Sequence, residues 1–183
     1  GIGGGITWDS NDQDEYKEAL TKAKVLAVSP MQFQLLETIG LEDGVFFISQ
    51  NHLNRLNKSA SYFNYHVDIA SAKEKLQDFA IAHQHGKWKV RLLSDRDGEI
   101  TIEGKEITEL TDSVPVKLAH HAVDKENPFL HYKTTNRNIY EKVKQRHPEV
   151  FDVLMWNQED EITEFTTGNI VVEIDGKLYT PPL

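Results

Sequence analysis

The sequence contains no cysteine, so disulfide bonds, zinc–thiolate sites and cysteine nucleophiles are excluded. Positive charge is scarce: 20 lysines and arginines stand against 29 aspartates and glutamates, a formal net charge of −9. Such a balance favours solubility and disfavours nonspecific binding to nucleic acid. No apolar run approaches the roughly 18 residues that span a bilayer, and the first residues lack the pattern of a secretory leader. We therefore expect a cytoplasmic protein that binds neither nucleic acid nor membranes.

The residues that are present predict a globular α+β protein. The chain has 183 residues, of which 39% are apolar and 27% charged, enough for one ordinary domain or two small ones. Apolar periodicity and turn signals predict two lobes with a boundary near "TDS". The predicted elements are a helix over 13–26, a hairpin over 29–49 that turns at Gly44, helices over 51–65 and over 68–86 (closed by Gly86), a hairpin over 87–107, an extended segment over 109–128, a helix over 133–148, and strands over 150–157, 161–174 and 177–183.

The histidines do not indicate a metal site. His120 and His121 are adjacent on an expected extended segment, where neighbouring side chains point to opposite faces, so they cannot easily share one metal. His83 and His85 lack a carboxylate at the helical spacing that would complete a site. We interpret all of them as structural or surface residues.

Three separate residues gain meaning when they are considered together. Alone, Lys133 resembles a surface lysine, Arg55 an ion-paired arginine and Glu164 an exposed strand residue. Together they are the groups that pyridoxal phosphate requires. A lysine carries the cofactor, an arginine grips its phosphate, and a carboxylate keeps its pyridine nitrogen protonated. They are far apart in the sequence, so spacing alone does not establish a common site.

Three quoted motifs carry a resemblance to a known family. The motifs are, in sequence order, "HLNRL", "HYKTTNR" and "FDVLMWNQEDEITEFTTGNIVVEIDGKLYTPPL". This order resembles that of pyridoxal-phosphate enzymes of the branched-chain and D-amino-acid aminotransferase fold, which includes aminodeoxychorismate lyase. The resemblance covers about 33–183. The lysine, with Asn136 and Arg137 three and four residues after it, is more similar to the lyase branch than to the aminotransferases. The implied fold is a two-lobed α+β enzyme with a small lobe and the first part of a larger lobe, truncated after "TPPL".

The resemblance assigns roles to individual residues. Lys133 would bind pyridoxal phosphate covalently and act as the general base, and the threonines after it would cap the next helix. Arg91, on a strand of the small lobe, would meet a substrate carboxylate. The expected cofactor-binding residues are Arg55, Glu164, Thr166, Thr167 and Asn169.

The first residues resemble a different family. "GIGGGITWDSNDQDEYKEALTKA" is similar to the C-terminal end of chorismate-utilising enzymes such as aminodeoxychorismate synthase component I. In that family, a glutamate at the position of Glu18 helps to hold magnesium. The resemblance implies a fusion of synthase and lyase, with a synthase tail and linker over 1–28, the small lobe over 29–113 and the lysine-bearing part over 114–183.

The expected function is the release of pyruvate from 4-amino-4-deoxychorismate to form 4-aminobenzoate in folate synthesis. A homodimer is expected, and a glutamine amidotransferase component is a partner expected for the full-length parent. Three alternatives stay open: an aminotransferase of the same fold, an inactive truncated fragment, and a binding module without this chemistry.

Overall fold

The computed structural model describes residues 32–108 and 112–182. The helix predicted over 13–26, the expected magnesium ligand Glu18 and the synthase-like tail lie outside them. No helix in the described part of the chain combines the length and the apolar character needed to cross a membrane.

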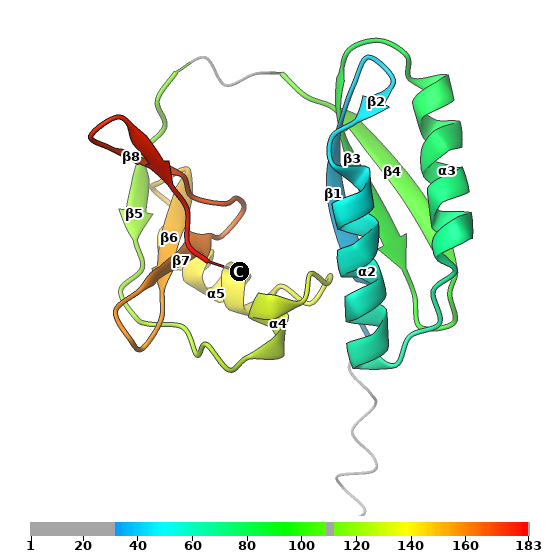
Figure 1. Cartoon of the computed structure of the whole chain (residues 1–183). Coiled ribbons are helices and arrows are strands. Elements are labelled where there is room, and N and C mark those ends of the chain that lie inside the picture. Colours follow the sequence, from blue (N-terminus) through cyan, green and yellow to red (C-terminus); the bar gives the residue numbers. More distant parts are fainter. Residues whose placement is uncertain (1–31, 109–111, 183) are drawn as a thin grey trace, which may run out of the picture. The chain divides into compact units, whose positions relative to one another are not determined.

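The first part of the described chain forms a four-stranded antiparallel sheet (Figure 1). Its strands are β1 (Leu35–Glu42), β2 (Val45–Phe46), β3 (Lys87–Ser94) and β4 (Ile100–Glu106), in the order β2-β1-β3-β4. Asp43 and Gly44 join β1 to β2 with φ angles of 47° and 78°, the backbone that a tight hairpin requires. Both predicted hairpins of this region are confirmed.

Two helices pack against this sheet, α2 (Ser49–Phe63) on β1 and α3 (Ile69–Ala82) on β4 (Figure 1). Leu53 and Leu56 of α2 are buried, as expected for the apolar side of an amphipathic helix. The Asp68 side chain fixes the start of α3 by accepting hydrogen bonds from the first backbone N–H groups of the helix. Both helices were predicted, although α3 ends before Gly86.

The second part of the described chain has a smaller sheet and a hairpin (Figure 1). In the sheet, β5 is parallel to β6, and β6 is antiparallel to β7. The parallel pair needs a long crossover, which contains α4 and α5. Val123, Tyr140 and Met155 form the core here. The elements are β5 (Val116–Leu118), α4 (Pro128–His131), α5 (Asn138–Gln145), β6 (Asp152–Trp156), β7 (Ile162–Phe165), β8 (Val172–Ile174) and β9 (Lys177–Tyr179).

The segment after Lys133 is less helical than predicted. The helix expected over 133–148 begins only at Asn138, and no side chain caps it, so the expected threonine cap is wrong. Thr135 instead accepts a hydrogen bond from the backbone N–H of Gln34, at 2.8 Å. A tertiary contact therefore takes the hydroxyl that local sequence rules assign to the helix end.

The short helix α4 was not predicted. The Asn127 side chain caps it by accepting a hydrogen bond from the N–H of Phe129, at 3.0 Å. Pro128 occupies the first turn, where its missing N–H has no partner to lose. The Asn-Pro pair is the local signal that favours this helix start.

Two strand glycines differ in the room around them. A Cβ added at Gly104 of β4 would lie 2.1 Å from Cζ of Phe79, whereas one at Gly40 of β1 would meet nothing within 4 Å. We expect Gly104→Ala to lower the free energy of unfolding by about 1–3 kcal/mol, because the ring or the backbone must move. The matched Gly40→Ala should change it by less than about 0.5 kcal/mol. Urea denaturation measures both, and equal effects would contradict the close packing of α3 on β4.

Candidate active site

A short backbone bridge joins the Lys133 segment to β1. The N–H of Leu36 donates to the carbonyl of Lys133 at 3.0 Å, and the N–H of Thr135 donates to the carbonyl of Gln34 at 2.8 Å. Because these bonds lie on either side of one residue pair, they fix both the position and the register of the lysine. The paired positions are Leu36 with Lys133, Leu35 with Thr134, and Gln34 with Thr135.

Lys133 lies among charged groups from several elements. Burial lowers the pKa of its amine below the ordinary value, and the guanidinium groups of Arg55 and Arg137 lower it further. Glu37 and Glu164 oppose that change. The amine makes no hydrogen bond or ion pair with another described residue. It is therefore a half-buried amine biased toward its neutral, nucleophilic form.

Glu37 is a buried carboxylate on β1 with two basic partners from α2. Arg55 donates to it twice, from Nε at 2.8 Å and from Nη2 at 2.5 Å, and His52 Nδ1 lies 2.7 Å from Oε2. Burial by itself raises the pKa of Glu37, but the hydrogen bonds and charges of Arg55 and His52 outweigh it, so the pKa falls below its ordinary value. A bidentate pair of this kind fixes the plane of the guanidinium group.

Glu164, on β7, receives a hydrogen bond from α5. The hydroxyl of Tyr140 donates to Oε1 of Glu164 at 2.7 Å, and the tyrosine is only 7% exposed. Arg137 lies over the Tyr140 ring, with its Cζ 3.9 Å from the ring centroid. Arg137 Nη2 also donates to the carbonyl of Thr166 at 2.6 Å. The start of α5 is therefore tied to the end of β7 at two points.

Asp152 organises the turn that follows β7. It is buried, and its carboxylate accepts hydrogen bonds from the hydroxyls of Thr166 and Thr167 and from the N–H of Thr167. Burial by itself raises the pKa of Asp152, but these hydrogen bonds lower it below the ordinary value. Both threonine hydroxyls donate to this carboxylate, so they fix the turn.

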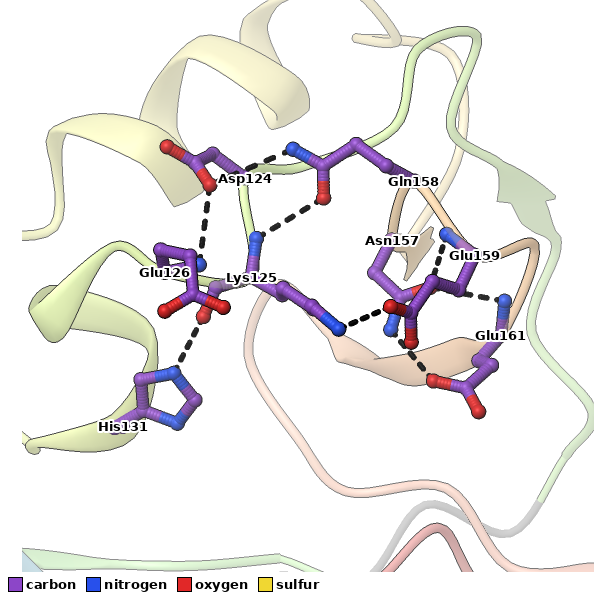
Figure 2. A network of polar contacts seen from close by, with 8 residues as sticks. All are labelled: Asp124, Lys125, Glu126, His131, Asn157, Gln158, Glu159 and Glu161. Carbon is purple, nitrogen blue, oxygen red and sulfur yellow. Dashed lines mark hydrogen bonds and ion pairs between the residues drawn. The ribbon is translucent and has the colours of Figure 1, made fainter.

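A second polar network holds the chain that leads to Lys133 (Figure 2). The side chain of Lys125 forms an ion pair with Glu159, and the backbone N–H of Lys125 donates to Oε1 of Gln158 at 3.2 Å. The carbonyl of Lys125 also lies 2.5 Å from Nε2 of His131, at the end of α4. Asp124 approaches Gln158 Nε2 at 3.5 Å. The loop before α4 is therefore attached to the β6–β7 turn, and β7 carries Glu164.

Three of the residues singled out from the sequence are electrostatically coupled, because the charges of Arg55 and Glu164 both act on the pKa of Lys133. Arg91 belongs to a different surface: it pairs with Glu103 across β3 and β4, Nη1 to Oε2 at 2.8 Å.

The remaining expected site residues follow β7. Thr166 is buried there, and Thr167 and Asn169 are exposed. Among the described residues no group of three or more histidines, aspartates or glutamates could hold a metal ion.

Sequence reasoning missed Glu37, His52, Tyr140 and Asp152. A signal existed for Glu37, because it lies two residues from both Leu35 and Ile39. Residues at this spacing share one side of a strand, and the two apolar neighbours indicate that this side is buried. An acid at such a position predicts a buried basic partner. Asp152 and Tyr140 gave no comparable signal, since their partners are distant in the sequence.

The residues of this cluster fit pyridoxal phosphate. Lys133 provides a shielded amine and Glu164 a carboxylate. Arg55 gives Nε and Nη2 to Glu37, and its side chain stays 43% exposed, which leaves Nη1 for an anion. The donor set therefore matches the amine, phosphate and nitrogen contacts that this cofactor requires.

Comparison with known proteins gives a family match. The model of the family described as amino-transferase class IV matches residues 34–183. A Schizosaccharomyces pombe protein provisionally named aminodeoxychorismate lyase is 28% identical over 163 residues, which are 81% of this chain and 66% of that protein. The chain thus spans just under two thirds of the length of this curated relative.

Two solved structures share the fold. One, from Mesorhizobium loti, is provisionally described as an amino-acid aminotransferase; it is 28% identical with a TM-score of 0.72 over 82% of this chain and 75% of that one. The other, a hypothetical aminotransferase from Mycobacterium tuberculosis in its PLP-bound form, is 18% identical with a TM-score of 0.68 over 81% and 60%. The expected branched-chain aminotransferase-like fold of mixed α+β class is confirmed.

The charge of Arg137 can be tested through Lys133. We expect Arg137→Gln to raise the pKa of Lys133, because a positive charge that disfavours the ammonium form is removed. Competitive labelling of the cofactor-free protein with acetic anhydride, read by mass spectrometry, should then move the Lys133 reactivity curve to higher pH. Arg146→Gln removes an equal charge at the end of α5 and should leave the curve in place. A curve that does not move in Arg137→Gln would contradict the coupling.

Proposed function

The chain belongs to the class IV aminotransferase family, and from that premise we propose that it is a pyridoxal-phosphate-dependent lyase. Its substrate would be 4-amino-4-deoxychorismate, and its products pyruvate and 4-aminobenzoate. The observation that carries the proposal is the half-buried amine of Lys133, which has no hydrogen bond or ion pair with another described residue. Its pKa is lowered by burial and responds to the charges of Arg55, Arg137, Glu37 and Glu164.

The cofactor proposal assigns each residue of the cluster a task. Arg55, oriented by Glu37, would grip the phosphate with its remaining N–H groups. Glu164 would accept a hydrogen bond from the protonated pyridine nitrogen. Thr166, Thr167 and Asn169 would line the cofactor's edge. When bound, pyridoxal phosphate supplies an electron sink for the reacting carbon.

Lys133 would perform two tasks in turn. As a neutral amine it would hold the cofactor, and its Nζ would also serve as the base that takes the proton from the amine-bearing carbon of the substrate. A pKa below the ordinary lysine value brings this base closer to neutral pH, where proton transfer is most effective.

Two observations support the lyase over the general family chemistry. The S. pombe relative is provisionally named for that activity, and Asn136 and Arg137 follow Lys133 in the arrangement that resembles the lyase branch. The second candidate is an amino-acid aminotransferase, favoured by the similarity to the M. loti structure. Either reaction would use the same lysine, arginine and glutamate.

The wider assembly is also a proposal. The similarity of residues 1–28 to a synthase tail supports a bifunctional parent in which Glu18 helps to hold magnesium and a glutamine amidotransferase component supplies ammonia. The small lobe would extend over 29–113 and the lysine-bearing part over 114–183. A homodimer and a cytoplasmic location belong to the same proposal. Arg91 would contact a substrate carboxylate only after releasing Glu103.

Covalent trapping tests the role of Lys133. The protein incubated with pyridoxal phosphate and reduced with borohydride should carry the label on the peptide that contains Lys133, as read by mass spectrometry. Lys133→Arg should abolish specific labelling and leave the far-ultraviolet circular dichroism unchanged. Lys142→Arg, on the exposed side of α5, should label like the unmodified protein. Label on another lysine in the unmodified protein would refute the assignment.

Product analysis separates the two candidate activities. With 4-amino-4-deoxychorismate and pyridoxal phosphate, the lyase should form 4-aminobenzoate and pyruvate in equal amounts without a keto acid. An aminotransferase should instead exchange an amino group in proportion to added keto acid and release no pyruvate. We expect the first result, and keto-acid-dependent exchange alone would replace the lyase by the second candidate.

A further inference from the structure

Tyr140 is the residue that no part of the proposed mechanism yet uses, although it touches one of the central groups. Its ring is part of the core of the second sheet, beside Val123 and Met155. Its hydroxyl donates a hydrogen bond to Oε1 of Glu164 at 2.7 Å. A buried tyrosine hydroxyl needs a partner, and here the partner is the carboxylate proposed to hold the cofactor's nitrogen.

We infer that Tyr140 is a positioning residue: it holds the Glu164 carboxylate by one oxygen so that the other oxygen faces the ring nitrogen of pyridoxal phosphate. This inference rests on the proposed function. A carboxylate has two oxygens, and the hydroxyl of Tyr140 occupies one of them. The second oxygen then has a direction set by α5 rather than by the free rotation of a glutamate side chain on a short strand.

The surroundings of Tyr140 make it suitable for this task. Burial raises its pKa, and the negative charge of Glu164 raises it further, so the hydroxyl keeps its proton and remains a donor. Arg137 covers the outer face of the ring at 3.9 Å, an attractive cation–π arrangement. Because Arg137 also donates to the carbonyl of Thr166, the Tyr140 ring, the Glu164 carboxylate and the turn after β7 are linked by direct contacts.

A purely structural role would have different consequences. If Tyr140 served only to fill the core, the loss of its hydroxyl would loosen the second sheet and weaken cofactor binding whatever residue stood at position 164. If it positions Glu164, the same loss should matter only when the glutamate is present. Tyr140→Phe separates the two cases because it keeps the ring and removes the hydroxyl alone.

A double-mutant cycle on cofactor affinity provides the test. The dissociation constant of pyridoxal phosphate is measured by absorbance titration for the unmodified full chain, Tyr140→Phe, Glu164→Gln and the double variant. We expect Tyr140→Phe to raise the constant about five-fold and Glu164→Gln about ten-fold or more. Adding Tyr140→Phe to Glu164→Gln should change it less than about two-fold. The visible circular dichroism of the bound cofactor should weaken in Tyr140→Phe, because the cofactor's ring would lose its fixed orientation.

A matched control uses the same substitution elsewhere. Tyr62 is 54% exposed, and its ring stacks on that of Tyr132. Tyr62→Phe should leave the dissociation constant and the visible circular dichroism unchanged. An equal effect of Tyr140→Phe in both backgrounds at position 164, or an effect in neither, would overturn the inference while leaving the proposed function intact. Failure of the unmodified chain to bind pyridoxal phosphate would overturn both.

Discussion

The backbone bridge between β1 and the segment at Lys133 is the constraint on which the candidate site depends. It consists of two main-chain hydrogen bonds, yet it joins a strand of the first sheet to the chain between α4 and α5. Glu37 follows the bridge on β1, so the lysine and the buried carboxylate are placed by one register. The pairing of β1 with β3 sets the side of the sheet on which Glu37 lies, so a slip of one residue at the bridge would displace Lys133 relative to Glu37.

The hydrogen bonds and ion pairs of the charged side chains determine the electrostatics of the site. Glu37 takes two donors of Arg55 and a nitrogen of His52, Glu164 takes the hydroxyl of Tyr140, and the amine of Lys133 is left without a hydrogen bond among the described residues. Arg55 keeps an exposed edge beside its ion pair with Glu37. The positive charge of Arg55 can therefore disfavour the charged form of Lys133 and still attract an anionic phosphate. An unpaired arginine would have the same charge, but its guanidinium group would lack the orientation that Glu37 fixes.

The sequence predicts the elements better than it predicts the contacts between them. Both hairpins and both helices of the first sheet follow from apolar periodicity and from turn residues such as Gly44. The single strand predicted over 161–174 is instead two strands, β7 and β8, which belong to different sheets. The helix after Lys133 starts late because Thr135 bonds to Gln34, a partner remote in the sequence. Glu37 was detectable from its buried strand position, whereas Tyr140 and Asp152 were not, because side chains far along the chain decide what they touch.

Arg55 and Arg91 differ in how firmly their partners orient them. Both are paired with a glutamate, but Glu37 is 1% exposed and Glu103 is 52% exposed. A pair in water contributes little and exchanges readily, so the pairing of Arg91 does not fix its direction. A buried carboxylate cannot exchange its partner for water without a large desolvation cost, so it holds Arg55 in one plane. Orientation by a buried partner, rather than charge alone, therefore distinguishes Arg55 from Arg91.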